Sequence, residues 1–312
     1  MTQTSKVGII GCGFVGSACA YTLMQRGLFS EMVLLDADRA RAEGEAMDIA
    51  HGLLFAKPMN IYAGTYADLS DAGFVIVTAG ANQKPGETRL DLVRKNGKIL
   101  LSILEELKNC RFDGILLIVS NPVDVLTRIA QQFSGLPENK VFGSGTVLDT
   151  ARLRYLLGEH LNVDSRGVHA FIVGEHGDSE IAVWSSATVA GMPLHEFCEL
   201  RGYFDHELAM RDIGESVKNS AYEIIERKHA TYYGIAMAVQ RICEAVVRDE
   251  KSVLPVSAAL HGEFGIENAT VSIPAVLGKN GVEQVVPVAL NRDELTRLHY
   301  SAETLNDAFS SL

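Results

Sequence analysis

The sequence is short of the features that mark secreted, membrane-spanning and nucleic-acid-binding proteins. Its five cysteines are odd in number and form no C-x-x-C pair, which argues against a disulfide framework and a cysteine metal site. No apolar run approaches the ~18 residues that a membrane helix requires. Only 28 Lys and Arg face 39 Asp and Glu, and this net charge of −11 disfavours nucleic acid and anionic membranes as partners. We therefore expect a soluble, cytoplasmic protein with reduced thiols and no metal.

The first part of the chain alternates short apolar runs with segments of helix length. At 312 residues the chain exceeds one typical domain. The runs are rich in β-branched residues without polar alternation, which is typical of strands buried on both faces. They cover residues 7–10, 32–35, 74–78 and 115–119. This alternation predicts a doubly wound parallel sheet.

The pattern changes after Asn139. The later elements are a helix over 147–161, strands near 168–173 and 181–189, a helical region over 204–249, and strands near 253–260, 269–276 and 283–286. A last helix begins after Asn291, with Glu294 placed to complete a capping box. We place the boundary between two domains after residue 143.

A glycine motif follows the first predicted strand. Gly11, Gly13 and Gly16 form G-x-G-x-x-G between this strand and a helix, which is the setting that a dinucleotide-binding turn requires. Asp36 ends the second predicted strand about twenty residues later, where a carboxylate accepts hydrogen bonds from a ribose and repels a 2′-phosphate. The motif therefore predicts NAD rather than NADP. The fold class is α/β, with an N-terminal Rossmann doubly wound parallel sheet over 1–143 and an α+β substrate-binding and catalytic domain over 144–312.

Polar residues that could take part in catalysis or binding stand at the ends of several apolar runs. His176 lies between Glu175 and Asp178 after an apolar run, where it could exchange protons near neutral pH, although a lone histidine at a strand end is more often structural. Asp149 and Arg152 lie three apart on a predicted helix and share a face. They form either a plain surface ion pair or an orienting carboxylate beside an anion-binding fork.

Two further segments follow predicted strands of the first sheet. The polar segment 80–89, with its glycines and a proline, has the composition of a lid and leaves the sheet edge at which ligands bind. Asn121 ends another strand at the same edge.

These motifs together resemble the bacterial L-lactate dehydrogenases of the lactate/malate dehydrogenase superfamily. The resemblance runs over essentially the whole chain, in order and spacing. It rests on Gly11–Gly16, Asn82–Arg89, Ser120–Pro122, Leu148–Arg152, Gly174–Asp178 and Ala230–Gly234.

The resemblance implies the reversible reduction of pyruvate to L-lactate by NADH. It implies that His176 is the general acid, that Asp149 is its partner, and that Arg89 stabilises negative charge on the carbonyl oxygen. The implied substrate-binding residues are Arg152, Gln83, Asn121 and Thr231. The implied cofactor-binding residues are Gly11, Gly13, Phe14, Val15, Gly16, Asp36, Ala79, Gly80 and Asn121.

Gln83 separates the possible substrates. Malate dehydrogenases of the superfamily carry an arginine at this position, which pairs with the second carboxylate of the substrate. A carboxylate buried against the neutral Gln83 would lack a counter-charge, so pyruvate is favoured over oxaloacetate. Branched 2-oxo acids are less securely excluded, and a catalytically idle binding protein is disfavoured because all four residues, His176, Asp149, Arg152 and Arg89, are present.

A second anion site is implied at Arg154 and His169. These residues match the positions at which allosteric bacterial members bind fructose bisphosphate between subunits. The alternative interpretation is that Arg154 is a solvated surface arginine. Arg154 lies about 200° around the helix from Arg152, so the two cannot serve one ligand. We therefore predict a homotetramer activated by fructose bisphosphate. His229 departs from the glycine that many relatives have before the Ala-Thr dipeptide, and we interpret it as a tolerated exposed change.

Overall fold

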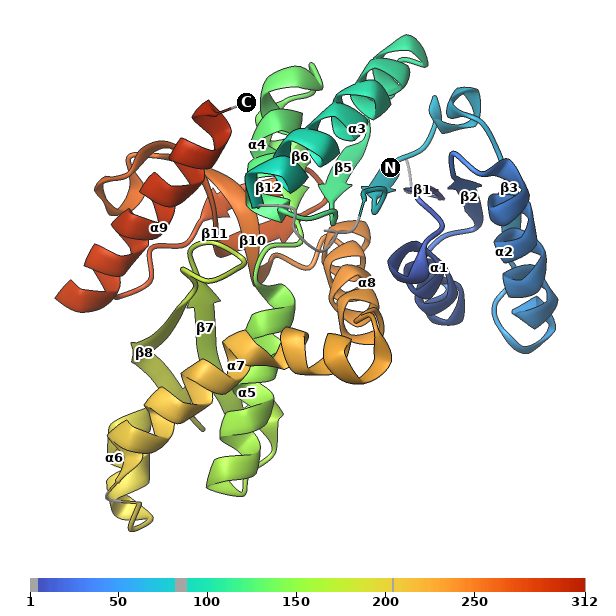
Figure 1. The fold of residues 1–312 in the computed structure, drawn as a ribbon. Coiled ribbons are helices and arrows are strands. Elements are labelled where there is room, and N and C mark those ends of the chain that lie inside the picture. Colours follow the sequence, from blue (N-terminus) through green and yellow to red (C-terminus); the bar gives the residue numbers. More distant parts are fainter. Residues whose placement is uncertain (1–4, 82–88, 204, 312) are drawn as a thin grey trace.

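A large sheet organises the fold in the computed structural model, which describes residues 5–81, 89–203 and 205–311 (Figure 1). In this part of the chain the sheet has nine strands in the order β12-β11-β10-β6-β5-β4-β1-β2-β3. The runs predicted to be strands form β1 (Lys6–Ile10), β2 (Glu31–Leu35), β4 (Phe74–Val77) and β5 (Ile115–Ile118). These strands pair in parallel, and β3 (Asn60–Ala63) and β6 (Val141–Gly143) extend the parallel part on either side. The predicted α/β fold class, with its N-terminal Rossmann sheet, is confirmed.

Helices cover both faces of this sheet. Alternate strand residues point to opposite faces, so each face builds its own apolar core. One core packs against α1 (Phe14–Arg26), α2 (Arg39–His51) and α8 (Tyr233–Val247). The other packs against α3 (Arg89–Asn109), α4 (Val123–Phe133) and α9 (Arg292–Ser310).

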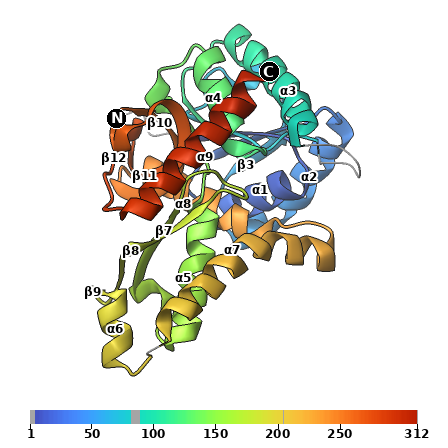
Figure 2. The ribbon, with the colours of Figure 1, turned by 60° about the vertical axis from the view of Figure 1, so that its left-hand side comes forward.

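A second, smaller layer lies beside the sheet. It contains the three-stranded antiparallel sheet of β7 (Val168–Val173), β8 (Ile181–Val189) and β9 (Met192–Pro193). This sheet packs with α5 (Val147–Leu161), α6 (Leu194–Leu200) and α7 (His206–Lys228) around a third apolar core. Figures 1 and 2 both show these elements gathered at the lower end of the molecule, away from α2 and α3. Short 3₁₀ helices complete the chain: η1 (Gly52–Phe55), η2 (Tyr66–Leu69), η3 (Glu138–Lys140), η4 (Ser165–Gly167) and η5 (Glu263–Gly265).

The late strands do not stay with the second layer. β10 (Ser252–His261), β11 (Glu267–Gly278) and β12 (Gly281–Val285) form an antiparallel group that joins β6 through the pair Ser257 and Gly143. The large sheet is therefore built from both parts of the chain. The boundary after residue 143 stays a prediction.

The helical region expected over 204–249 is not one helix. It is α7 and α8, separated at His229, whose φ of +68° is left-handed and ends α7. The capping box of α9 is confirmed, because Asn291 and Glu294 each accept a backbone N–H of the other. In the described residues no helix is both long and apolar enough to cross a membrane.

Candidate active site

The predicted cofactor positions gather at one edge of the sheet. β1 lies between β2 and β4, so the connections that leave β1 and β4 diverge to opposite sides. Ligands bind at such a switch point, beyond the carboxyl ends of the strands. The segments that follow β1, β2, β4 and β5 carry Gly11, Asp36, Gly80 and Asn121.

The glycine turn after β1 combines tight packing with open space. Gly11 has a φ of +102°, and a Cβ at this position would lie 2.5 Å from the amide nitrogen of Ala79. A Cβ on Gly16 would lie 1.8 Å from the carbonyl oxygen of Gly11. A Cβ on Gly13 would meet nothing within 4 Å. The turn therefore needs glycine for its own packing at two positions, and at the third it leaves the backbone open to a ligand.

The surroundings of this turn fit a dinucleotide. Gly13 precedes α1 without any side-chain cap, so the first N–H groups of the helix, at Phe14 and Val15, are available to an anion such as a pyrophosphate. The Asp36 carboxylate accepts the N–H of Cys12 at 2.6 Å and that of Asp38 at 2.9 Å. These contacts fix a carboxylate beside the turn, where a ribose would be held.

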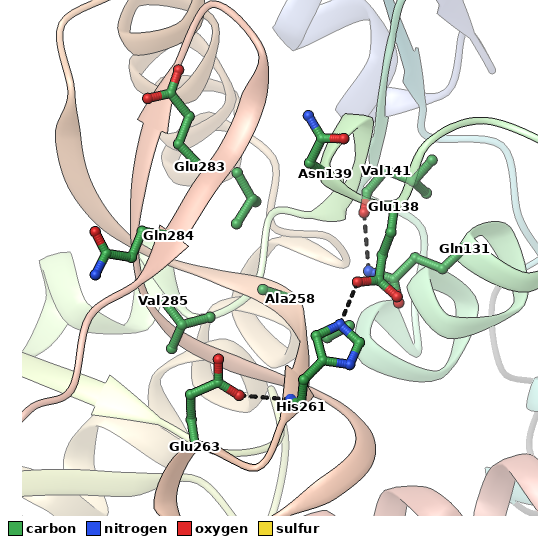
Figure 3. A pocket seen from close by; sticks show the side chains of 12 residues that line it. Gln131, Glu138, Asn139, Val141, Ala258, His261, Glu263, Glu283, Gln284 and Val285 are labelled. Carbon is green, nitrogen blue, oxygen red and sulfur yellow. Dashed lines mark hydrogen bonds and ion pairs between the residues drawn. The ribbon is translucent and has the colours of Figure 1, made fainter.

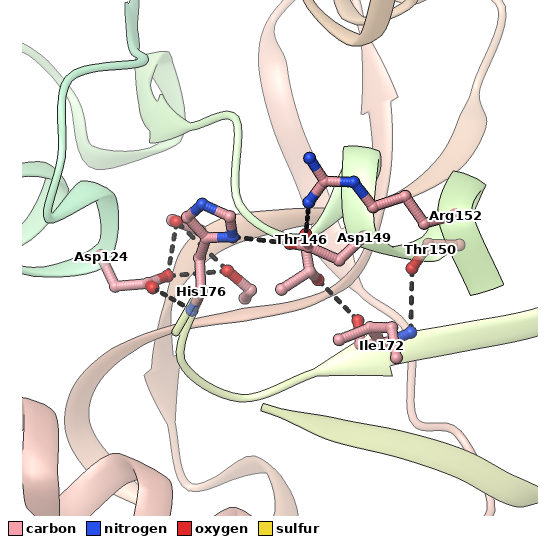
Figure 4. Close-up of polar contacts among 9 residues, drawn as sticks. Asp124, Thr146, Asp149, Thr150, Arg152, Ile172 and His176 are labelled. Carbon is pink, nitrogen blue, oxygen red and sulfur yellow. Dashed lines mark hydrogen bonds and ion pairs between the residues drawn. The ribbon is translucent and has the colours of Figure 1, made fainter. Parts of the chain in front are cut away.

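His176, Asp149 and Arg152 form a continuous chain of contacts (Figure 4). Nδ1 of His176 lies 2.6 Å from Oδ2 of Asp149, and an Arg152 nitrogen donates to Oδ1 of the same carboxylate at 2.8 Å. The Asp149 side chain is only 3% exposed, whereas that of His176 is 26% exposed. One buried carboxylate thus orients both cationic side chains. The structural reading of His176 and the plain surface ion pair are both disfavoured.

His176 and Asp149, which we call the dyad, each shift the pKa of the other. Burial opposes a charge on His176, but the adjoining Asp149 carboxylate outweighs burial and raises the pKa of the imidazole to about 9. Burial likewise opposes a charge on Asp149, yet His176 and Arg152 hold the pKa of this carboxyl below its usual value. At neutral pH the dyad is therefore an ion pair. Asp149 contacts Nδ1 of the imidazolium, so it makes no hydrogen bond with the Nε2–H.

A buried network that the sequence did not reveal holds the loop of His176. The backbone N–H of His176 donates to Asp124 at 2.7 Å, and the hydroxyls of Ser257 and Ser272 donate to the other oxygen of this carboxylate at 2.6 and 2.7 Å. Asp124 lies in the first turn of α4, directly after the segment that contains Asn121. The network therefore brings the histidine loop to the sheet edge that carries the cofactor positions.

Asn96 is a second residue that sequence reasoning missed. Its side chain accepts the N–H of Ala81 at 2.8 Å and donates to the carbonyl of Asn121 at 2.7 Å. It is 3% exposed. Asn96 thus joins Ala81, in the segment after β4, to the loop after β5.

Some predicted positions fall elsewhere. Gln83 lies outside the described residues, and of Arg89 only the backbone, which begins α3, is described. Thr231 is half-buried between α7 and α8. Its neighbour Tyr232 stacks on Phe14 with 5.4 Å between the ring centroids, which brings this junction to the glycine turn.

Arg154 and His169, predicted from the sequence to form a second anion site, lie side by side in one chain. A guanidinium nitrogen of Arg154 lies 3.1 Å from Nδ1 of His169, and the guanidinium also lies over the ring of Phe171. Its buried Nε has no hydrogen-bond partner in the described part of the chain. Arg152 instead contacts Asp149, so the two arginines point to different places, as the helix geometry predicts.

Three side chains at the dyad have the ligand types and spacing of a cation site. Ligand atoms of Asp149, His176 and Glu180 lie within 4.8 Å of one another. Arg152 already occupies Oδ1 of Asp149, and a metal ion would have to compete with its positive charge. The expectation that no metal is bound stays a prediction.

A cavity of about 210 Å³ lies apart from these residues, beside η3, β10 and β12 (Figure 3). The ion pair of His261 with Glu138, at 2.6 Å, closes one side of it. None of the predicted site residues lines this cavity. It takes no part in the candidate active site.

Known proteins resemble the chain over its full length. The family model for the lactate/malate dehydrogenase NAD binding domain matches residues 5–143, and that for the lactate/malate dehydrogenase alpha/beta C-terminal domain matches residues 146–311. An L-lactate dehydrogenase of Acetivibrio thermocellus is 50% identical over 98% of this chain and 97% of its own, and one of Priestia megaterium is 50% identical over 97% and 95%. The crystal structure of the minor L-lactate dehydrogenase from Enterococcus mundtii in a ligands-bound form matches with a TM-score of 0.96 at 43% identity, over 100% of this chain and 99% of that chain.

Proposed function

Because this chain belongs to the lactate/malate dehydrogenase family, and within it to the NAD-dependent L-lactate dehydrogenases, we propose that it reduces pyruvate to L-lactate with NADH and catalyses the reverse reaction with NAD. The observation that carries the proposal is the chain of contacts from Arg152 through Asp149 to His176. It provides a positioned proton donor and an anchored cation next to each other, as the reduction of a 2-oxo acid anion requires.

His176 supplies the proton of the reaction. When bound at the glycine turn, NADH supplies the hydride that reaches the carbonyl carbon. The imidazolium donates its Nε2 proton to the carbonyl oxygen, while Asp149 holds Nδ1 and keeps the ring oriented. In the reverse direction the neutral imidazole accepts the proton of the lactate hydroxyl.

The remaining residues bind and orient the substrate. Arg152 uses one N–H on Asp149 and keeps the others for the substrate carboxylate. We assign Arg89 to the negative charge that develops on the carbonyl oxygen. Asn121 donates a hydrogen bond within the site, and Thr231 lines the wall beside the methyl group.

Pyruvate is the proposed substrate because Gln83 is neutral. The second carboxylate of oxaloacetate would have no counter-charge at this position. The test is a steady-state NADH-oxidation assay with pyruvate, oxaloacetate and a branched 2-oxo acid. We expect pyruvate to have the highest kcat/KM. A preference for oxaloacetate or for the branched acid would replace the proposal by a malate or branched-chain 2-hydroxy acid dehydrogenase.

We also propose a cytoplasmic homotetramer. Leu54 and Phe55 of η1 are 85% and 88% exposed, and Met47 of α2 and Met237 of α8 are 62% and 58% exposed. All come from the helical layer on one face of the sheet, and apolar surface of this kind favours burial against another subunit. The five free cysteines suit a reducing compartment. A monomeric mass by sedimentation at micromolar concentration would contradict the assembly.

Fructose bisphosphate is the proposed effector. Arg154 and His169 already lie side by side on one chain, and a two-fold axis would bring two such pairs around the two phosphates. Because the guanidinium donates to Nδ1, the hydrogen of a neutral His169 ring stands on Nε2, free for a phosphate oxygen. Pyruvate turnover measured with and without the sugar phosphate tests the proposal, and an unchanged KM and kcat would contradict it.

A further inference from the structure

Glu180 is a buried acid that the mechanism above does not use. It ends the turn that begins directly after His176, where its backbone N–H donates to the carbonyl of Gly177 at 3.1 Å. The residue is 4% exposed. Its Oε1 is buried and accepts no hydrogen bond from any described residue. A buried carboxylate oxygen without a donor disfavours the ionised form of the group.

This acid faces the reacting dyad. A carboxylate oxygen of Glu180, a ring nitrogen of His176 and a carboxylate oxygen of Asp149 lie within 4.8 Å of one another. Burial raises the pKa of Glu180 to about 8, and the charge of Asp149 acts in the same direction, while His176, Lys218 and Arg152 lower it. Glu180 thus adds a second carboxyl group to the cluster that His176 and Asp149 form.

A cavity links Glu180 to solvent by a route that the dyad does not line. This cavity has a volume of about 380 Å³. Its lining comes from the loop after β7, from α7 and from α9: Glu175, Asp178, Ser179, Glu180, Lys218, Arg297, Tyr300 and Thr304. The ionisable residues around Glu180 are therefore Asp149 and Arg152 of α5, His176 in its own loop and the charged residues of this lining. Glu180 thus lines a cavity that neither His176 nor Asp149 lines.

The charge of Glu180 decides whether the site attracts an anion. Asp149, Arg152 and the protonated His176 together leave one positive charge in excess, which the carboxylate of a 2-oxo acid neutralises. Ionised Glu180 would cancel that excess before the substrate arrives, so these four side chains would offer the anion no net positive charge at low dielectric.

We propose that Glu180 is a positioning residue of this active site, which must carry its proton for the 2-oxo acid to bind. The inference rests on the proposed function, since it names the charge state in which that site accepts its substrate. It predicts that substrate affinity depends on two protons, one held by His176 and one by Glu180. Loss of either proton expels the substrate anion.

The test measures binding of oxamate, a pyruvate analogue that is not reduced, to the NADH-saturated enzyme between pH 7 and pH 10. For the wild type we expect the oxamate Kd to rise by up to about a hundredfold per pH unit at the alkaline end, whereas Glu180→Gln should reach only about tenfold per unit, because one proton remains linked. Asp178→Asn is the matched control, since it removes a negative charge from the same loop and should keep the two-proton dependence. A wild-type rise limited to about tenfold per unit, or a variant that keeps the steeper rise, would overturn the proposal.

A measurement on the wild type alone covers the case in which the variant does not fold. Calorimetry of oxamate binding near pH 9.5, in two buffers of different ionisation enthalpy, gives the number of protons taken up. More than one proton per site supports the proposal, and one or fewer contradicts it.

Stability provides a readout that needs no substrate. The folded-state pKa of Glu180 lies above the ordinary 4.5, so the folded chain holds a proton that the unfolded chain loses, and stability falls as pH rises from about 4.5 to about 8. Glu180→Gln removes this loss, so its Tm relative to wild type should increase between pH 5 and pH 8.5. A constant difference would contradict the buried, proton-holding state.

The outcomes separate the two proposals. If the wild type turns over pyruvate at pH 7 but shows one-proton binding, only the role of Glu180 fails. If it neither turns over pyruvate nor binds oxamate at pH 7, the proposed function fails, and the role of Glu180 in binding fails with it.

Discussion

The backbone N–H of His176 donates a 2.7 Å hydrogen bond to the carboxylate of Asp124, which joins the loop after β7 to the first turn of α4. Two serine hydroxyls, from β10 and β11, donate to the other oxygen of the same carboxylate. His176, the proposed proton donor, is thus positioned twice, through its ring by Asp149 and through its backbone by Asp124. The first contact sets the charge of the ring, and the second sets its place.

Removing the Asp124 carboxylate should weaken both the fold and the reaction. Asp124→Ala removes the acceptor of three hydrogen bonds, so we expect the free energy of unfolding to fall by about 2–4 kcal/mol. We expect kcat to fall by at least about tenfold, because small displacements of a catalytic group are costly. Urea unfolding and steady-state kinetics with pyruvate measure the two effects.

Asp293→Ala is the matched control for Asp124. Its side chain is 80% exposed in the first turn of α9, and the change should stay within about 0.5 kcal/mol of wild type. Wild-type kcat in a folded Asp124→Ala variant would contradict the positioning role.

Replacing Asp149 should move the pH profile towards acid. Reduction of pyruvate needs protonated His176, so the wild-type rate should fall as pH rises through about 9. In Asp149→Asn the carboxylate that raises the pKa of the imidazole is gone, and the fall should move down by about two pH units or more. We also expect kcat to drop by about 10²–10⁴, because the ring loses its orienting partner. An unchanged profile of kcat/KM against pH would remove Asp149 from the mechanism.

In the parallel part of the large sheet, the strands that could be predicted are those that bury both faces. β1, β2, β4 and β5 read as apolar runs because every residue in them except Glu31 is buried. β3 is only partly buried at the sheet edge, and β6 has three residues, so neither produces a run. Nor does the sequence indicate that β10 would extend the first sheet, because that connection depends on a single registered pair.

The site was predictable where its residues are close in sequence or belong to a recognisable motif. Asp149 and Arg152 are separated by one helical turn, so their contact follows from helix geometry. Asp124 and Asn96 gave no such signal. An acid in the first turn of a helix usually stabilises the helix itself, and the partners of Asp124 are 52, 133 and 148 residues away in the chain.

His229 shows where the predicted helical region over 204–249 divides into two helices. Helical periodicity continues through the segment, but the backbone of His229 is left-handed, with φ +68° and ψ −7°. A residue with a Cβ is destabilised by about 1 kcal/mol in the left-handed region of backbone conformation, and glycine is not.

His229→Gly should therefore stabilise the protein. We expect an increase of about 0.5–1 kcal/mol in the free energy of unfolding, measured by urea titration. His229→Ala is the control, since it removes the imidazole but keeps the Cβ and should give no such gain. Equal stabilisation by both variants would show that the imidazole, rather than the backbone conformation, is unfavourable.

Arg154→Ala should separate regulation from chemistry. The guanidinium contacts His169 and Phe171, whereas the dyad is served by Arg152, so basal pyruvate turnover should stay close to that of wild type. Activation by fructose bisphosphate should be lost, because each charge-assisted phosphate contact contributes about 1.5–3 kcal/mol and the effector would lose one from every subunit at the interface. Arg166→Ala is the matched control, since this exposed arginine pairs only with Asp164 among the contacts described for it, and activation should persist. Retained activation in Arg154→Ala, or its loss in Arg166→Ala, would move the effector site away from the pair of Arg154 and His169.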